Sequence, residues 1–159
     1  MPNPTAEEQF LLELLNETRL NPLANALRYI SSNSPLTSDN AAIQNAFSYF
    51  KVDGSALLSA FQNLQTVGPL AWNNNLADAA QSHSAAMITA DQQSHQVPGE
   101  AALGDRVTAA GYKWARLAEN VFAYSEDMIH AHAGFMVDWG NGPNGMQDPA
   151  GHRINIMSS

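Results

Sequence analysis

The string Gly151-His152-Arg153-Ile154-Asn155-Ile156 places a histidine at the head of a short amphipathic segment, after a run rich in Gly and Asn. Two other strings have a similar character: Ser94-His95 follows a helical run, and Ala118-Glu119-Asn120-Val121 lies next to turn-forming residues. Two imidazoles and a carboxylate from three separate segments are what a first-row metal site or an acid/base cleft requires. His95, Glu119 and His152 are therefore the first candidates for a functional site.

The bulk composition predicts one folded domain that does not bind nucleic acid. The 159 residues are enough for a single core, and 45% apolar against 14% charged residues lies outside the range of disordered chains. Seven Lys and Arg against fifteen Asp and Glu give a formal net charge of −8. Such a surface repels phosphate backbones and anionic lipids, so nucleic acid is not an expected partner.

The sequence contains no transmembrane segment and no signal sequence that we recognise. No apolar stretch approaches the length that spans a bilayer, and Met1-Pro2-Asn3-Pro4 is neither a basic nor an apolar leader region. Cysteine is absent, so there is no disulfide framework and no thiolate ligand. Any metal must therefore be held by His, Asp or Glu.

Local patterns predict a mainly helical chain. Thr5-Ala6-Glu7-Glu8 is a capping box, and the apolar stripe that follows it should end near Asn21-Pro22. Asn75 is a plausible cap for a helix that ends at about Asp91, and Gly111 should close a short helix in the αL conformation. Helical spacing also predicts helices over residues 23–29, 40–50, 55–64, 103–112 and 126–137.

One segment is predicted to be a strand, and several to be loops. Residues 120–124 (Asn-Val-Phe-Ala-Tyr) have alternating, β-branched and aromatic character, which would place Glu119 at the entrance of a strand. Loops are predicted at 31–35, at 91–99 around His95, and at 140–145. Lying alone, the strand would leave ladder groups unpaired, so we expect self-association through that edge, or low stability.

The other three histidines are not included in the predicted site. His83 lies on the apolar face of its predicted helix, where a histidine is more often a satisfied core residue than a ligand. His130 and His132 are two apart on a predicted helix, so they point to different sides and cannot readily share a metal.

Several strings, taken in order, resemble the CAP superfamily of cysteine-rich secretory proteins, antigen 5 and pathogenesis-related proteins, also called SCP-like, and most closely its secreted bacterial branch. The resemblance begins at about Phe10, and residues 31–67 form an apparent insertion. Its strings are Asn16-Glu17-Thr18-Arg19, Leu70-Ala71-Trp72, Ala80-Gln81-Ser82-His83-Ser84, Ser94-His95, Ala110-Gly111-Tyr112, Glu119-Asn120-Val121 and residues 151–156.

This resemblance implies an α+β fold, an α-β-α sandwich with a small, mostly antiparallel sheet, over residues 1–159 as a single domain. It also implies a cleft in which two histidines and two acidic residues meet, here His95, Glu119, His152 and, less directly, Asp138. Asp138 stands where relatives usually carry Glu, one methylene longer. The family's closing strands are missing after Ser159, so we expect an incomplete, helix-rich version of the fold.

Three hypotheses for function follow. The first is an extracellular protein whose cleft binds Zn²⁺ or another divalent cation through His95, Glu119, Asp138 and His152. The second is a non-catalytic module for a small apolar ligand (lipid or sterol), a peptide or a glycan; Phe122, Tyr124, Phe135 and Trp139 are candidate lining residues, although such aromatics are more often core. The third, which we favour least, is a metal-assisted hydrolase with Glu119 and His95 as catalytic residues.

A purely structural interpretation of the four side chains stays open beside these hypotheses. Hydrogen-bonded polar clusters also fix loops to one another, and Glu119 would then accept from an imidazole without taking part in any binding. Asp148, on the loop before His152, is a substitute carboxylate in either case.

Overall fold

The computed structural model describes residues 4–159, so most of the Met1–Pro4 segment considered above lies outside the described residues. By their contacts the residues form two compact units. Residues 5–70 and 124–159 form one, which we call the helical unit. Residues 71–123, together with Pro4, form the other, which we call the inserted unit because its sequence interrupts that of the helical unit.

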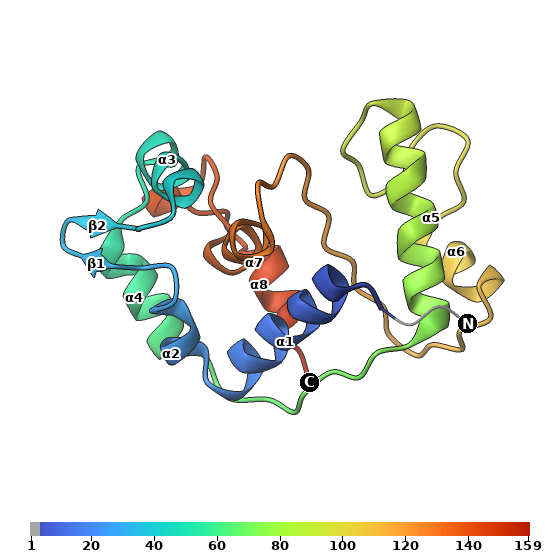
Figure 1. The fold of residues 1–159 in the computed structure, drawn as a ribbon, viewed down its shortest axis with the longest axis horizontal. Coiled ribbons are helices and arrows are strands. Elements are labelled where there is room, and N and C mark those ends of the chain that lie inside the picture. Colours follow the sequence, from blue (N-terminus) through green and yellow to red (C-terminus); the bar gives the residue numbers. More distant parts are fainter. Residues whose placement is uncertain (1–3) are drawn as a thin grey trace. The chain divides into compact units, whose positions relative to one another are not determined.

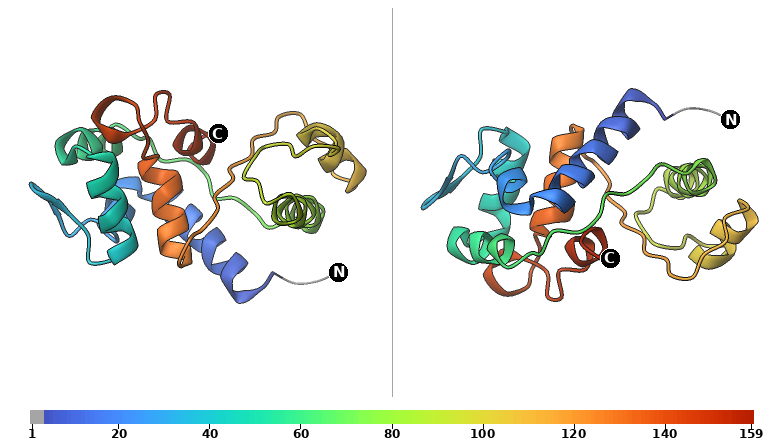
Figure 2. Two further views of the ribbon diagram at one scale, coloured as in Figure 1. Left: turned by 90° about the horizontal axis from the view of Figure 1, so that it is seen from above. Right: turned by 90° about the horizontal axis from the view of Figure 1, so that it is seen from below.

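The helical unit is built around α7, which lies between α1 and α3 (Figure 1). Figure 2 shows the same order of these three helices from two further directions. In addition α2 packs on α1 and α4, and α8 packs on α7. The elements of this unit are α1 (Ala6–Leu20), α2 (Pro22–Ala26), β1 (Ser32–Asn33), β2 (Leu36–Thr37), α3 (Ala41–Phe50), α4 (Gly54–Gln62), α7 (Met128–Val137), the 3₁₀ turn η1 (Pro143–Gly145) and α8 (Gly151–Ile156).

The predicted start and end of the first helix are confirmed. Thr5 accepts from the backbone of Glu8, whose carboxylate accepts in return from the backbone N–H of Thr5 at 2.8 Å. Asn21 both ends α1 and caps α2, with Pro22 as the first residue of α2, where its missing N–H leaves no hydrogen bond unmade. Asn21 therefore separates the two helices.

The core of the helical unit encloses α7. Every residue from Ala131 to Val137 is buried, so this helix is covered on all sides rather than amphipathic. The largest fully buried apolar side chains of this unit come from four of its helices: Leu14, Ile43, Leu57, Phe61, Met136 and Val137. Burial of side chains of this size supplies most of the favourable free energy of folding.

The inserted unit has two helices, α5 (Asn74–Ala90) and α6 (Leu103–Ala109), with long loops after each. Asn73 caps α5 by accepting from the N–H groups of residues 75 and 76, so the predicted cap at Asn75 was wrong by two positions. The predicted ends are confirmed, since Asp91 closes α5 in the αL conformation and Gly111 follows α6 with φ +86°. Few large apolar side chains are buried in this unit, which makes its polar contacts important.

The predicted α+β class with a small antiparallel sheet is confirmed, but the predicted strand was wrong. The sheet is a hairpin of β1 and β2, two residues each, with Ser32 opposite Thr37. It lies within residues 31–67, the apparent insertion, and β1 falls in the loop predicted at 31–35. Residues 120–124 form no strand, because the side-chain amide of Gln93 takes the place of a neighbouring strand. It donates to Val121 O at 3.3 Å and accepts from Ala123 N at 3.2 Å.

Self-association was expected through the unpaired edge of a strand at 120–124. Because these residues form no strand, that edge does not exist. Among the described residues, no helix has both the length and the apolar character needed to cross a membrane.

Candidate functional site

His95 and Glu119, predicted to meet from different segments, form a pair in the inserted unit. Nδ1 of His95 lies 3.0 Å from Oε2 of Glu119. The His95 side chain is 62% exposed, whereas that of Glu119 is 13% exposed. The imidazole ring of the pair is therefore open to solvent, while the carboxylate that contacts it is largely buried.

Arg106 fixes the Glu119 carboxylate from the other side. Its guanidinium donates to Oε1 of Glu119 at 3.0 Å and to the backbone carbonyl of His95 at 3.1 Å. The side chain of Arg106 is only 8% exposed, so this ion pair is screened less than one on the surface. Arg106, on α6, thus holds both members of the His95–Glu119 pair.

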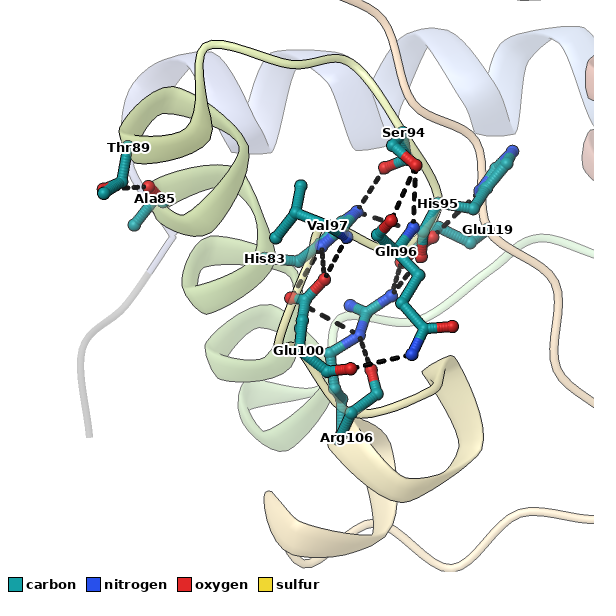
Figure 3. A network of polar contacts seen from close by, with 11 residues as sticks. His83, Ala85, Thr89, Ser94, His95, Gln96, Val97, Glu100, Arg106 and Glu119 are labelled. Carbon is teal, nitrogen blue, oxygen red and sulfur yellow. Dashed lines mark hydrogen bonds and ion pairs between the residues drawn. The ribbon is translucent and has the colours of Figure 1, made fainter.

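Behind this pair lies a second one, between His83 on α5 and Glu100 (Figure 3). Nδ1 of His83 is 2.8 Å and 2.9 Å from the two oxygens of Glu100, and Nε2 is 2.9 Å from the carbonyl oxygen of Ser94. Nε2 also lies 3.8 Å from Oε2 of Glu119. His83 is 2% exposed, which agrees with the interpretation of a satisfied, inward-facing histidine, but it belongs to the same network as the predicted site.

The environment of Glu100 favours its charged form. Burial alone would raise the pKa of the Glu100 carboxyl, but hydrogen bonds from His83 and from the Val97 backbone, with the positive charge of Arg106, lower its pKa overall. Glu100 is therefore a carboxylate over the whole neutral range.

Sequence reasoning missed the roles of His83, Glu100 and Arg106. His83 stands in one of the strings shared with the CAP superfamily, and it is buried on a helix beside an acidic loop. A histidine on the inner face of a helix needs polar partners, and the acidic residue of Gly99-Glu100 at the end of the following loop was an available one.

The other two predicted site residues, Asp138 and His152, form a pair in the helical unit. Oδ1 of Asp138 is 2.7 Å from Nδ1 of His152, while Oδ2 accepts from the backbone N–H of His152 at 2.9 Å. Asp138 ends α7 in the αL conformation with φ 56°, and its carboxylate lies at the beginning of α8. Its negative charge is favourable there, because the first N–H groups of a helix point outward.

Both pairs have the geometry of a carboxylate that orients a histidine. A carboxylate that accepts from Nδ1 fixes the tautomer in which Nε2 carries the lone pair, as is common for histidines that bind metals. Asp138 is completely buried and both its oxygens already accept hydrogen bonds, so it suits this orienting role better than direct ligation. Within the described part of the chain, no three His, Asp or Glu side chains are gathered as ligands.

His130 and His132 have separate environments, as predicted from their spacing. His132 is buried and its Nε2 is 3.0 Å from the hydroxyl of Thr18, whereas Nδ1 of His130 accepts from the backbone of Glu126 at 3.2 Å. Burial lowers the pKa of His132 to about 4, with a smaller contribution from the charge of Arg28. His132 is therefore a neutral core residue.

A cavity of about 260 Å³ lies in the inserted unit and includes Glu119 and Arg106 in its wall. Its other walls are mostly apolar and come from Leu76, Ala79, Ala80, Leu103, Val107 and Leu117. Of the aromatic residues proposed to line a groove, Phe135 is buried in the helical unit, whereas Tyr124 is 89% exposed. A larger hollow of about 610 Å³, between α1 and α2, contains no histidine.

Comparison with known proteins supports the order of strings described above. The family profile "CAP: Cysteine-rich secretory protein family" matches residues 12–159, which is nearly the whole chain. Neither a comparison with curated proteins nor one with solved structures finds a match. With the profile covering both histidine–carboxylate pairs, the chain belongs to the CAP family of cysteine-rich secretory proteins.

Proposed function

We propose that this chain is a secreted, extracellular CAP protein of the bacterial branch that binds a divalent cation, zinc first among them, through its histidine–carboxylate pairs. The observation that carries the proposal is the exposed His95 ring, held at Nδ1 by Glu119 at 3.0 Å. This contact leaves the lone pair on Nε2, which is the form of imidazole that zinc binds. His152 with Asp138 is the second pair to which the proposal extends.

The same contacts favour binding over hydrolysis. A general base for a metal-bound water needs a carboxylate oxygen that can reach that water. The oxygens of Glu119 already accept from Arg106 and contact His95. Glu119 would therefore orient the imidazole of His95, which would hold the zinc, and would not serve as the base for a zinc-bound water.

Zinc titration by isothermal calorimetry tests the proposal. We expect saturable binding to the unmodified protein and at least a tenfold weaker affinity in His95→Ala. Glu119→Gln, which removes the orienting charge, should weaken binding by about 10- to 100-fold. His130→Ala and Glu126→Gln are matched controls that remove the same groups elsewhere on the chain.

The proposal fails if His95→Ala binds zinc as tightly as the unmodified protein. His152→Ala separates the contributions of the two pairs: a weaker affinity would show that the His152–Asp138 pair also contributes to zinc binding, whereas an unchanged one would limit binding to His95 and Glu119.

The cavity of about 260 Å³ favours a second candidate function, the binding of a small apolar ligand. Its apolar walls and its polar end at Arg106 and Glu119 are typical of small-molecule sites, which orient a ligand with few polar groups. Displacement of a fluorescent fatty acid probe tests it, with Ala80→Phe to fill the cavity and Ala85→Phe, on the same helix, as control. Equal binding by both variants would argue against the cavity.

A further inference from the structure

We infer that His83 is the positioning residue of the predicted binding site: its ring, bonded to Ser94 and Glu100, holds the loop that carries His95. The inference rests on the proposed function only where it concerns cation affinity. The positioning of His95 is a property of the protein without any cation.

Both ring nitrogens of His83 face acceptors. Nδ1 lies 2.8 Å from Glu100 and Nε2 lies 2.9 Å from the carbonyl oxygen of Ser94. A neutral imidazole carries one N–H, whereas the imidazolium form carries two, so only the charged ring donates to both partners. At 2% exposure and with both nitrogens in use, His83 has no nitrogen to offer a cation. It can act only through its neighbours.

The neighbours that it holds lie on both sides of His95. The carbonyl of Ser94 accepts from His83, and the carbonyl of His95 accepts from Arg106 at 3.1 Å. Two adjacent peptide groups of the loop are therefore fixed by two side chains, His83 from α5 and Arg106 from α6. α5 is a regular helix of 17 residues, which makes it a firm support for the loop that follows it.

The polar side chains of this network are closely linked. Arg106 lies near the carboxylates of both Glu100 and Glu119, and His83 contacts the same two carboxylates. Because these side chains are largely buried, removing one leaves its partners without compensation in a poorly solvated place. Loss of the His83 ring would remove the donor to the Ser94 carbonyl and the closest partner of Glu100, which would keep only the Val97 backbone and Arg106.

Figure 3 shows that His83 reaches the loop from α5 while Arg106 reaches it from α6. The ring of His95 comes from the loop that these two side chains hold, and it meets Glu119 at the edge of the network. His83 on α5 thus acts on the His95 ring indirectly. It bonds the carbonyl of Ser94, which precedes His95, and it lies 3.8 Å from Glu119, which contacts the ring.

The test is the tautomer of His95 in the metal-free protein, observed by ¹⁵N–¹H NMR of the imidazole rings. In the unmodified protein we expect the Nδ1–H form of His95 to dominate. In His83→Phe, which keeps a ring but no donors, we expect the two tautomers to average and zinc affinity to fall at least tenfold. His132→Phe is the matched control, because it makes the same change at the buried histidine of the other unit; both readouts should stay as in the unmodified protein.

An unchanged His95 tautomer in His83→Phe would overturn the inference. Glu100→Gln serves if His83→Phe does not fold, because it leaves the His83 ring in place and removes only its charged partner. It should weaken zinc binding and broaden the His95 signals, and unmodified values for both would count against positioning. If the unmodified protein binds no zinc, the proposed function fails, while the NMR result still decides whether His83 positions His95.

Discussion

Asp138 contacts His152 twice, because one carboxylate oxygen lies 2.7 Å from the ring nitrogen Nδ1 and the other accepts from the backbone N–H at 2.9 Å. The same side chain thus orients the histidine and caps the helix on which that histidine lies. A residue that performs both tasks links the geometry of the candidate site to the stability of α8.

Asp138→Asn should destabilise the helical unit by about 2 kcal/mol, since it replaces charge-assisted hydrogen bonds with weaker ones in a fully buried place. Asn tolerates the αL conformation of this position, so the backbone itself is not strained. Urea unfolding followed by circular dichroism measures the change. Asp39→Asn, at an exposed position of the same unit, should alter the free energy of unfolding by less than about 0.5 kcal/mol.

Thr18→Val should lower the free energy of unfolding by about 2 kcal/mol, although threonine and valine have nearly the same shape. The Thr18 hydroxyl is completely buried and bonds the side chain of Asn25 at 2.7 Å and that of His132 at 3.0 Å. Valine would leave both partners unsatisfied away from water. Ser48→Ala removes an exposed hydroxyl that also bonds the carbonyl four residues back, and its unfolding midpoint should hardly move. Equal midpoints for the two variants would contradict the prediction.

His132 should make the helical unit sensitive to acid. Its pKa is lowered to about 4 in the folded protein from an ordinary 6.5, so the unfolded chain takes up the proton first as pH falls. Stability is therefore fully present above about pH 6.5 and is lost progressively toward pH 4, by about 3 kcal/mol in all. Urea midpoints at pH 7, 5.5 and 4.5 measure this.

The control for this pH dependence is His132→Phe, which has no titrating group at the position. Its stability should fall less steeply between pH 6.5 and 4 than that of the unmodified protein. The prediction is wrong if both proteins lose stability in parallel over this window.

Gly145→Ala should be strongly destabilising, by about 3 kcal/mol or more. Gly145 has φ +72°, and an added Cβ would meet the carbonyl oxygen of Phe50 and lie 2.7 Å from the backbone nitrogen of Val52. Gly99 has a similar φ of +84° with nothing within 4 Å of such a Cβ. Gly99→Ala should therefore lower the free energy of unfolding only by the cost of a positive φ in a residue with a Cβ, about 1 kcal/mol. The difference between the two unfolding free energies isolates the steric part.

Helix ends were predictable from sequence where a local side chain determines them. The Thr5 capping box and the αL closure at Gly111 depend only on near neighbours, and both are confirmed. The prediction of a strand at 120–124 was wrong. Strand propensity describes how well residues fit beside a neighbouring strand, and the sequence does not show whether such a neighbour exists. Here the side chain of Gln93 bonds Val121 and Ala123 instead.

The site was predictable to the extent that family strings preserve it. The pairing of His95 with Glu119 followed from the order of those strings, and the structure brings the two together. Glu100 and Arg106 were missed because their contacts join residues 13 to 17 positions apart, each pair connected by a helix end and an irregular loop, where no periodicity predicts which side chains meet. His83 was correctly predicted to be buried, yet burial alone did not reveal its partners.

Arg19, near the end of the first helix, donates to the carbonyl groups of Ile156 and Ser158, the latter 139 residues away. Its guanidinium is buried and also donates to the carbonyl of Gly68, so it connects α1 with two distant segments of backbone. During synthesis on the ribosome α1 emerges early, but this buried cation can find its acceptors only after residue 158 has left the exit tunnel. The contacts that hold α1 to residues 156–158 therefore form only after the whole stretch between them has been synthesised.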